Sequence, residues 1–318
     1  MYNKRLLQAI NYSYPDQIPV SVGLLPAVWI HYGKDMVKLA KEYPDMVPNI
    51  PDLDNIPIPE TYRSGTHIDE WGCVWSNTKE GMESIVTGHP LPRREDVRTL
   101  QIPQNEDGRL PHGFMYLRLL DLRGFEEVMI DFAEECEELQ MLIDKVVEYN
   151  CRQMEIVLSR HGKGDILWLG DDLGMQHGLA IGAEKWRKYL KPAFSKIFAP
   201  AKAKGCIIYM HTDGYILDIM QDIVDCGADM INPQFRANGI ENLARICKGK
   251  IPIDLDLDRQ LFPNAAPSQI DDHIRECVET MYMPEGGLAL KAEISYEMPL
   301  ENIAAVFDAL MKYRDYKG

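Results

Sequence analysis

The chain has 318 residues, a length that accommodates one large domain or two small ones. Hydrophobic residues make up 46% and charged residues 26%, proportions typical of soluble globular proteins, which exclude collagen-like fibres, coiled-coil rods and intrinsic disorder. The 34 basic and 49 acidic residues leave a net charge of −15, which opposes binding to nucleic acid or to anionic lipid.

The N-terminal part of the chain predicts an alternation of strands and helices. Strands are predicted over 18–24 and near 114–119, and helices over 35–43, 125–136 and 139–161. Residues 44–110 interrupt this alternation with eight prolines, and their stretch 67–75 alternates apolar and polar residues like a pair of strands. We interpret 44–110 as an insertion.

From about residue 160 onward, short apolar runs alternate with longer amphipathic stretches, a pattern that predicts repeated β-α units and a parallel sheet. The predicted strands are 165–170, 206–210, 228–232, 251–255 and 287–291, and the predicted helices are 183–204, 216–226, 240–247, 268–281 and 300–313. Pro192 and Pro200 predict a kink or break in the first of these helices. The total approaches eight units, so the predicted fold is α/β, a single TIM (β/α)8 barrel over 1–318 with the insertion 44–110 covering one end.

The sequence shows no segment that would insert into a membrane or direct secretion. No run of 18 or more uncharged apolar residues occurs, and the first residues lack the apolar core and cleavage site of a signal peptide. We therefore predict a cytoplasmic protein without membrane insertion.

The seven cysteines are widely spaced, and none forms a CxxC pair or stands beside a histidine. They are interpreted as reduced structural thiols, not as zinc ligands.

The residues that follow the predicted strands are unusually acidic, and in a β/α barrel these positions hold the chemistry. They are Asp171, Asp172, His211, Asp213, Gln234, Asp254, Asp256 and Glu293. His211 and Asp213 are two residues apart, so both side chains can face the same side of a strand. Imidazole together with carboxylates suits zinc or another first-row divalent ion. The alternative is that His211 is a hydrogen-bonded residue at a strand end and Asp213 caps the next helix.

Adjacent residues of a strand face opposite sides, so one of Asp171 and Asp172 is expected to face the pocket and the other to cap a turn or meet solvent. Carboxylates that share a pocket need a bound cation, a protonated member or a cationic substrate, because like charges raise one another's pKa. Trp71 is a candidate pocket wall, with simple packing as the alternative. His31, His67, His89, His112 and His273 are interpreted as structural residues.

These residues, in this order, resemble the uroporphyrinogen decarboxylase superfamily, which also includes corrinoid-dependent methyltransferases. The resemblance spans nearly the whole chain and implies a TIM barrel, in agreement with the element count. It is carried by residues 5–11 with 15–20, 69–72, 170–174 before 186–192, 211–214, 227–233 and 298–303. These motifs are typical of the superfamily and do not indicate one activity.

The sequence departs from two branches of that superfamily. The decarboxylase proper has an N-terminal RxxGRY segment for its acidic porphyrinogen, whereas residues 23–32 contain no arginine. An acidic mouth would also repel eight substrate carboxylates, so a role in haem synthesis is disfavoured. The zinc methyltransferases hold their metal with HxC on one strand and a cysteine at the end of the last strand. The corresponding residues here are His211, Asp213 and Ala292, the last beside Glu293.

Exchange of cysteine for carboxylate implies a harder, more Lewis-acidic centre that suits activation of an oxygen or polarisation of an ether or amine. The predicted function is therefore a methyltransferase-like enzyme that demethylates a small methoxylated or methylamine-type substrate and passes the methyl group to a separate corrinoid protein. The predicted ligands of a divalent metal such as zinc are His211, Asp213 and Glu293. The predicted proton donor to the leaving group is Asp171 or Asp256, and the predicted substrate-binding residues are Trp71, Asp172, Gln234 and Asp254.

Two alternatives stay open. One is a metal-free decarboxylase or lyase of a small acid, for which Lys291, Arg118 and Arg236 are the candidate anchors. The other is a catalytically silent binding barrel, which the loss of both expected cysteines favours. Convergence of the carboxylates in one pocket would argue against the silent barrel, because burying several acids together is costly. Members of the superfamily are often dimers, so a homodimer is one expected state.

Overall fold

The computed structural model describes residues 2–318, and the chain divides into two compact units. Unit 1 is formed by the residues up to 65, by 76–85 and by 234–318, and unit 2 by 66–75 and 86–233. Large apolar side chains are fully buried in both, such as Phe307 and Met36 in unit 1 and Trp186 and Phe132 in unit 2. The expectation of a single domain over 1–318 is not tested by this division and stays a prediction.

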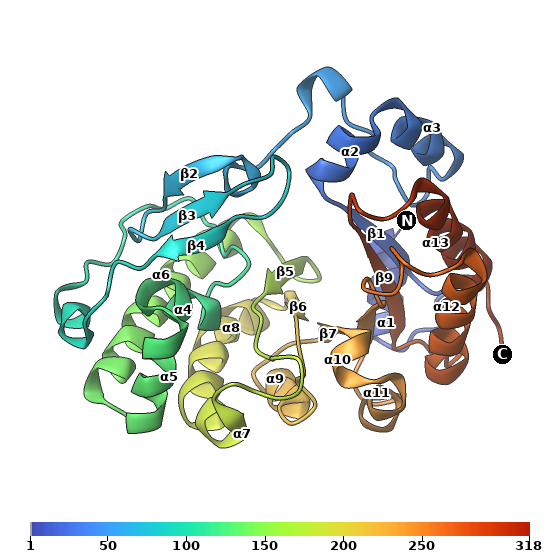
Figure 1. Ribbon diagram of the computed structural model, residues 1–318. Helices are drawn as coiled ribbons and strands as arrows, with labels where there is room; N and C mark the ends of the chain where they lie inside the picture. The colour runs from blue at the N-terminus through green and yellow to red at the C-terminus, as the bar shows by residue number, and fades with distance from the viewer. Residues whose placement is uncertain (1) are drawn as a thin grey trace. The chain divides into compact units, whose positions relative to one another are not determined.

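Unit 2 is built on three parallel strands, which Figure 1 shows in yellow-green to light orange. The strands lie in the order β5 (Ile166–Gly170), β6 (Ile207–Thr212) and β7 (Met230–Pro233). The helices are α4 (Tyr116–Arg123), α5 (Phe125–Glu134), α6 (Glu137–Arg160), α7 (Gly182–Lys185), α8 (Lys191–Lys204) and α9 (Met220–Asp225), with a 3-10 turn at Arg94–Thr99 and a π-helical turn at Trp186–Leu190. A separate sheet has the order β2 (Gly65–Ile68), β3 (Val74–Asn77) and β4 (Ile85–Gly88).

Alternation along β5 and β6 gives their sheet two different faces. Leu167, Leu169, Ile208 and Met210 are buried, and α8 packs against both β6 and α6. Because successive side chains of a strand point to opposite faces, Trp168, Gly170, Tyr209 and His211 lie on the other face of the sheet. One face of the sheet therefore packs against the helices, and the opposite face carries Trp168 and Tyr209 and, at the strand ends, polar residues.

Unit 1 is built on three further parallel strands, in the order β1 (Val20–Leu24), β9 (Leu288–Ile294) and β8 (Ile253–Asp256). Its helices are α1 (Tyr2–Ile10), α2 (Pro26–Tyr32), α3 (Lys34–Glu42), α10 (Phe235–Asn238), α11 (Ile240–Cys247), α12 (Pro267–Met281) and α13 (Leu300–Tyr313), with 3-10 turns at Leu53–Asn55 and Glu60–Tyr62. Helices α12 and α13 pack against each other, as the orange and red ribbons of Figure 1 show.

Most predicted elements are confirmed to within a few residues, and the helix predicted over 300–313 has these bounds in the structure. The strand predicted near 114–119 is wrong, since α4 occupies most of that stretch. A short apolar run does not distinguish a strand from a buried helix by its periodicity. The predicted break in the helix 183–204 is confirmed: the π-helical turn comes just before Pro192, whose ring nitrogen has no N–H to donate.

The described residues contain six parallel strands, three of them in each unit, where the sequence analysis expected about eight. The α/β class is confirmed, and a closed eight-stranded barrel is not. The strand pair predicted within 67–75 is confirmed as β2 and β3, joined by a turn in which the Asp69 amide donates to the Cys73 carbonyl (3.0 Å). That 44–110 covers one end of a barrel stays a prediction.

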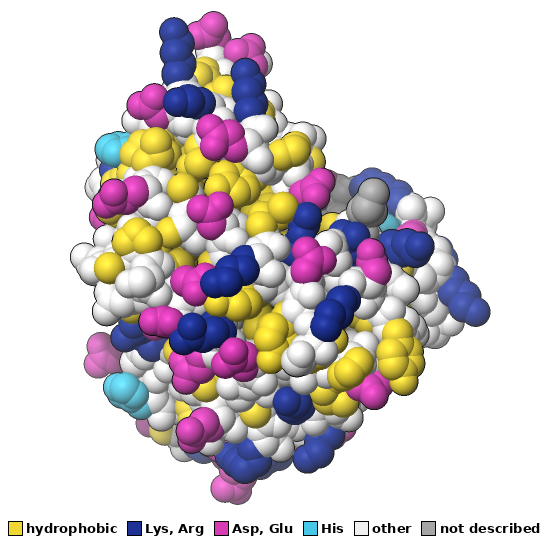
Figure 2. Space-filling view, turned by 90° about the vertical axis from the view of Figure 1, so that its right-hand side faces the viewer, with side chains coloured by type: hydrophobic (Ala, Val, Ile, Leu, Met, Phe, Trp, Pro, Cys, Tyr) yellow, Lys and Arg dark blue, Asp and Glu magenta, His cyan; other side chains and the backbone are white. Residues whose placement is uncertain are grey.

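The charged side chains are mixed on the surface drawn in Figure 2, where Lys and Arg are interspersed with Asp and Glu. Ion pairs such as Lys312–Asp271 (2.9 Å) follow from this mixture. Isolated exposed pairs of this kind contribute little to stability. Among the described residues, no helix is both long and apolar enough to cross a membrane.

Candidate metal centre

The carboxyl ends of β5 and β6 bring two of the sequence motifs side by side. Gly170 of β5 pairs in register with His211 of β6. Beyond this pair, the Asp171 amide donates to the His211 carbonyl (3.1 Å), and the Asp213 amide donates to Asp172 Oδ1 (3.1 Å). The acidic residues of both motifs are therefore placed by one backbone and one side-chain hydrogen bond just past the strands.

Glycines make this close approach of the two loops feasible. A Cβ on Gly214, whose φ is +82°, would lie 2.2 Å from the backbone of Gly174, and a Cβ on Gly174 would lie 2.4 Å from the Tyr215 amide nitrogen. The loops can touch only without side chains at these positions. The Gly174 amide then donates to the Asp213 carbonyl (3.1 Å), which fixes Asp213 beside the β5 loop.

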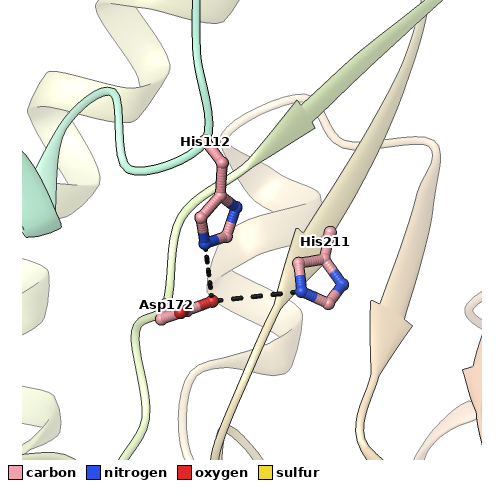
Figure 3. Close-up of side chains that lie close together, drawn as sticks. All are labelled: His112, Asp172 and His211. Carbon is pink, nitrogen blue, oxygen red and sulfur yellow. Dashed lines mark ion pairs between the residues drawn. The ribbon is translucent and has the colours of Figure 1, made fainter. Parts of the chain in front are cut away.

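Figure 3 shows the resulting cluster, in which His112, Asp172 and His211 point toward one another. His112 Nε2 lies 3.2 Å and His211 Nε2 4.0 Å from Asp172 Oδ1. Asp213 adds a second carboxylate, with its Oδ1 3.2 Å from His211 Nε2. In the part of the chain that the structure describes, His112, Asp172 and His211 form the one metal-compatible group, with ligand atoms all within 4.8 Å of one another.

Both imidazoles are oriented by residues that are not themselves part of the cluster. His211 Nδ1 lies 2.6 Å from the side-chain oxygen of Asn232, its partner in register on β7. An amide oxygen only accepts, so Nδ1 donates to it and Nε2 is the nitrogen that faces the cluster. The His112 ring lies against Gly170, where an added Cβ would come within 2.6 Å of Nδ1. The face opposite α8 therefore presents two imidazole nitrogens toward one carboxylate.

This donor set fits a first-row divalent cation. Zinc binds imidazole nitrogen and carboxylate oxygen at about 2.0–2.2 Å, which places ligands of a tetrahedral site roughly 3–4 Å from one another. The three contacts of 3.2, 4.0 and 3.2 Å are close to this spacing. The four side chains are also 18 to 37% exposed, so a small molecule can reach them.

Asp171, the neighbour of Asp172, has a different environment. It is fully buried, and its carboxylate accepts from the backbone amides of Met115 (2.9 Å), Tyr116 (2.5 Å) and Leu117 (2.9 Å) at the start of α4. Burial raises the pKa of Asp171 to about 6, although these N–H donors favour the ionised form. The side chain thus anchors the N-terminus of α4, and both its oxygens are occupied.

The other predicted residues lie in unit 1, apart from Trp71. Asp254 and Asp256 are buried, and the backbone of Gln234 pairs with that of Asp256. Glu293 accepts from Arg259 Nη1 (3.0 Å), and the Tyr2 hydroxyl lies 3.4 Å from Asp254 Oδ2. The predicted metal ligands are thus divided between units, with His211 and Asp213 in unit 2 and Glu293 in unit 1. The role of Glu293 as third ligand stays a prediction.

Trp71 is buried and packs edge-on against Tyr149, with ring centroids 5.0 Å apart. The turn around it is held by Asp69, whose carboxylate accepts from the Trp71 amide (3.0 Å) and pairs with the buried Arg118 (2.6 Å). These contacts match the packing alternative for Trp71. They also show that Arg118, a candidate anchor for an acidic substrate, is already held by a carboxylate.

His112 is the residue that sequence reasoning missed. The sequence predicts a structural role for His112, since no motif surrounds it and both its cluster partners are distant in the chain. The structure brings it to the site because the segment before α4 runs beside β5, where the Gly113 amide donates to the Gly170 carbonyl (2.8 Å). No sequence motif near His112 indicates that its segment pairs with β5, because the pairing depends on where the loop before α4 lies in the folded chain.

The comparisons with known proteins agree with this architecture. The sequence model of the family described as uroporphyrinogen decarboxylase (URO-D) matches residues 115–313, more than half of the chain. The chain belongs to the uroporphyrinogen decarboxylase family. The resemblance noted from the sequence is thereby confirmed. The family match includes Asp172, His211 and Asn232, whereas His112 lies just before it.

Solved structures extend the comparison to the whole chain. A methyltransferase from Methanosarcina mazei is 17% identical, aligns over 98% of both chains and has a TM-score of 0.68. At this identity the likeness shows a shared fold. A dihydropteroate synthase from Xanthomonas albilineans with 4-aminobenzoic acid is 16% identical over 47% of this chain and 52% of that chain, with a TM-score of 0.31, too low to support an argument. No curated protein matches the chain.

Proposed function

We propose that this member of the uroporphyrinogen decarboxylase family is a metal-assisted methyltransferase. It would take a methyl group from a small methoxylated or methylamine-type substrate and pass it to a corrinoid protein. The observation that carries this proposal is the convergence of His112, Asp172 and His211 at the ends of β5 and β6. The fold shared with a protein named as a methyltransferase supports the same reaction class.

The side chains of unit 2 have distinct roles in this proposal. His112, His211 and Asp172 would hold the ion. Asp213 lies outside this group, but its Oδ1 is 3.2 Å from His211 Nε2, and we assign it as the candidate fourth ligand. When bound, a divalent ion such as zinc supplies Lewis acidity to an oxygen or nitrogen of the substrate. Asn232 orients His211 through the 2.6 Å contact with Nδ1. Asp171 is assigned an anchoring role and no proton transfer, because both its oxygens accept from backbone amides; Asp256 keeps the predicted role of proton donor.

The two alternatives have less support from the described residues. Decarboxylation of a small acid needs a cationic anchor, yet Arg118 pairs with Asp69 (2.6 Å) and Arg236 pairs with Asp258 through two hydrogen bonds of 2.9 and 2.7 Å. Lys291 is the remaining candidate. A silent barrel gives no reason for two oriented imidazoles beside two partly exposed carboxylates, since such groups are costly to hold together without a ligand.

The test is metal content measured by mass spectrometry on protein purified without a histidine tag. We expect nearly one ion per chain in the natural protein and its loss in His211→Ala and His112→Ala. His177→Ala is the matched control, because His177 follows β5 but is exposed and lies outside the cluster. Methyl transfer to free cob(I)alamin, followed by absorbance, should fall roughly 100-fold in the two cluster variants and not in the control.

Two results would refute the proposed metal site. One is protein that holds no ion in any sample, even after zinc or manganese is added. The other is His211→Ala protein that keeps both its ion and its turnover. Folding of each variant is checked by thermal unfolding, so that loss of the ion is not confused with loss of the fold.

A further inference from the structure

Below the metal-compatible cluster, the same face of the sheet carries a row of apolar side chains. The register places Trp168 of β5 beside Tyr209 of β6, and Tyr209 beside Met230 of β7. Gly170, His211 and Asn232 form the next row, two residues further along each strand. Because a strand rises about 3.3 Å per residue, the two rows lie roughly 6–7 Å apart.

Trp168 is one of the exposed large hydrophobic residues, although it lies in a sheet beside a buried aromatic ring. It is 48% exposed, whereas its ring partner Tyr209 is buried. The two ring centroids are 4.5 Å apart with planes tilted by 49°, so Tyr209 supports Trp168 from one side. A large aromatic ring that is held in place but open to solvent on the face of a site is suited to contact a ligand.

The charges around this face favour a cation over an anion. Segments 110–115, 171–181 and 213–219, which lie beside β5 or follow β5 and β6, contain no Lys or Arg. Arg236, which follows β7, is paired with Asp258 (2.7 Å). Asp172 and Asp213 are both partly exposed at the cluster. A carboxylate substrate would find no basic partner in these segments, whereas an ammonium group would meet negative potential and an indole face.

We propose that Trp168 binds the methylated ammonium group of a small substrate whose oxygen-bearing end reaches the His112–Asp172–His211 cluster. This inference rests on the proposed function and narrows its substrate class to N-methylated ammonium compounds that carry a hydroxyl group. The spacing of the two rows matches such a short molecule. Cation–π contact with an indole face provides the recognition.

In this substrate class a metal held by the cluster would bind the hydroxyl oxygen and orient the molecule, because a quaternary nitrogen has no lone pair to offer it. The C–N bond of a quaternary ammonium breaks with its electron pair staying on nitrogen, which leaves a neutral tertiary amine. The methyl acceptor would be the reduced corrinoid of the proposed partner protein, which would supply both electrons of the new bond. No proton has to be delivered to this leaving group, in keeping with the buried and fully engaged Asp171. For this substrate class the proton-donor role predicted for Asp256 would not be needed.

The experiment is calorimetric titration of the natural protein with choline, with its neutral isostere 3,3-dimethylbutan-1-ol and with 2-methoxyethanol. We expect choline to bind at least about 10-fold more tightly than either neutral probe. Trp168→Leu should weaken choline binding by about 2- to 30-fold, and Trp168→Phe should recover part of that loss. Phe125→Leu is the control, because Phe125 is equally exposed, at 48%, but begins α5.

Metal content is measured on the same samples, so the inference and the proposed function fail in different ways. Equal binding of choline and its isostere, or unchanged choline binding in Trp168→Leu, overturns the inference even if the protein holds its metal. Tighter binding of 2-methoxyethanol overturns it in favour of methoxylated substrates. Trp168-dependent choline binding by protein that never holds metal supports the inference and refutes the metal role.

Discussion

At the scale of single residues, the candidate site depends on side chains that would not touch the ion. Asn232 is fully buried and holds Nδ1 of His211, so the orientation of that imidazole is set on the neighbouring strand. Gly170 leaves the space in which the His112 ring lies. Outer residues of this kind commonly change metal affinity by about 10- to 100-fold when they are altered.

Replacement of Asn232 tests this orienting role. We expect Asn232→Leu to lower zinc affinity by about 10- to 100-fold, because His211 loses the acceptor that fixes its tautomer and ring position. Asn232→Asp should keep the affinity, since a carboxylate oxygen accepts the same hydrogen. A chromophoric chelator that competes for zinc measures both. If both variants lose stability while their folded fraction binds zinc normally, Asn232 serves only packing.

At the scale of elements, the helix that replaces the strand predicted near 114–119 begins at a buried carboxylate from another part of the chain. The carboxylate of Asp171 satisfies three backbone amides at the start of α4, which have no partner within the helix itself. This long-range cap ties α4 to the end of β5. The two adjacent aspartates that follow β5 therefore have different environments. Asp171 is buried beneath α4, and Asp172 lies in the candidate metal site.

The same substitution should therefore affect a different property at each of the two aspartates: stability at Asp171 and metal binding at Asp172. We expect Asp171→Asn to lower the free energy of unfolding by about 2–4 kcal/mol, because an amide cannot accept all three hydrogen bonds and a buried N–H is left unpaired. Asp172→Asn should change stability by less than about 1 kcal/mol but remove the metal. Urea unfolding and metal content on both variants test this; equal stability of the two would contradict the assigned roles.

At the scale of the whole molecule, buried ionisable groups give opposing contributions to the pH dependence of stability. Burial lowers the pKa of His273 to about 4 and raises the pKa values of Asp121 and Asp171 to about 6. The contribution of His273 is complete above its unfolded pKa of 6.5 and is lost as the pH falls toward 4. The two carboxyls act in reverse, since their contribution is complete below pH 3.8 and is lost as the pH rises through 6.

His273 can be separated from the carboxyls by substitution. Its Nε2 accepts from the Asp258 amide (3.1 Å), a bond that protonation would break. We expect His273→Asn, which keeps an acceptor but does not titrate, to lose about 3 kcal/mol less than the natural protein between pH 7 and pH 4, the equivalent of the pKa change from 6.5 to about 4. Urea unfolding at pH 7, 5.5 and 4 measures this. Parallel pH profiles for the two proteins would show that His273 does not titrate on unfolding.

The candidate site was only partly predictable. His211 and Asp213 were predicted as a pair because they share one strand, and their side chains do lie together, with Nε2 and Oδ1 3.2 Å apart. Asp172 was expected to bind substrate, yet in the structure it lies among the metal-compatible atoms. The alternation rule predicted that Asp171 and Asp172 would differ but did not indicate which one would be buried, since that depends on where α4 begins.

The sequence by itself determined the α/β class, the bounds of most helices and strands, the family and the acidic character of the strand ends. These properties follow from local periodicity, composition and short motifs, each of which can be recognised in a short stretch of sequence. Only the tertiary structure decided that His112 joins His211, that Asp171 caps α4 and that Trp168 is exposed below the cluster. Each of these depends on strand register and on contacts between residues distant in the chain, for which a single sequence carries no local signal.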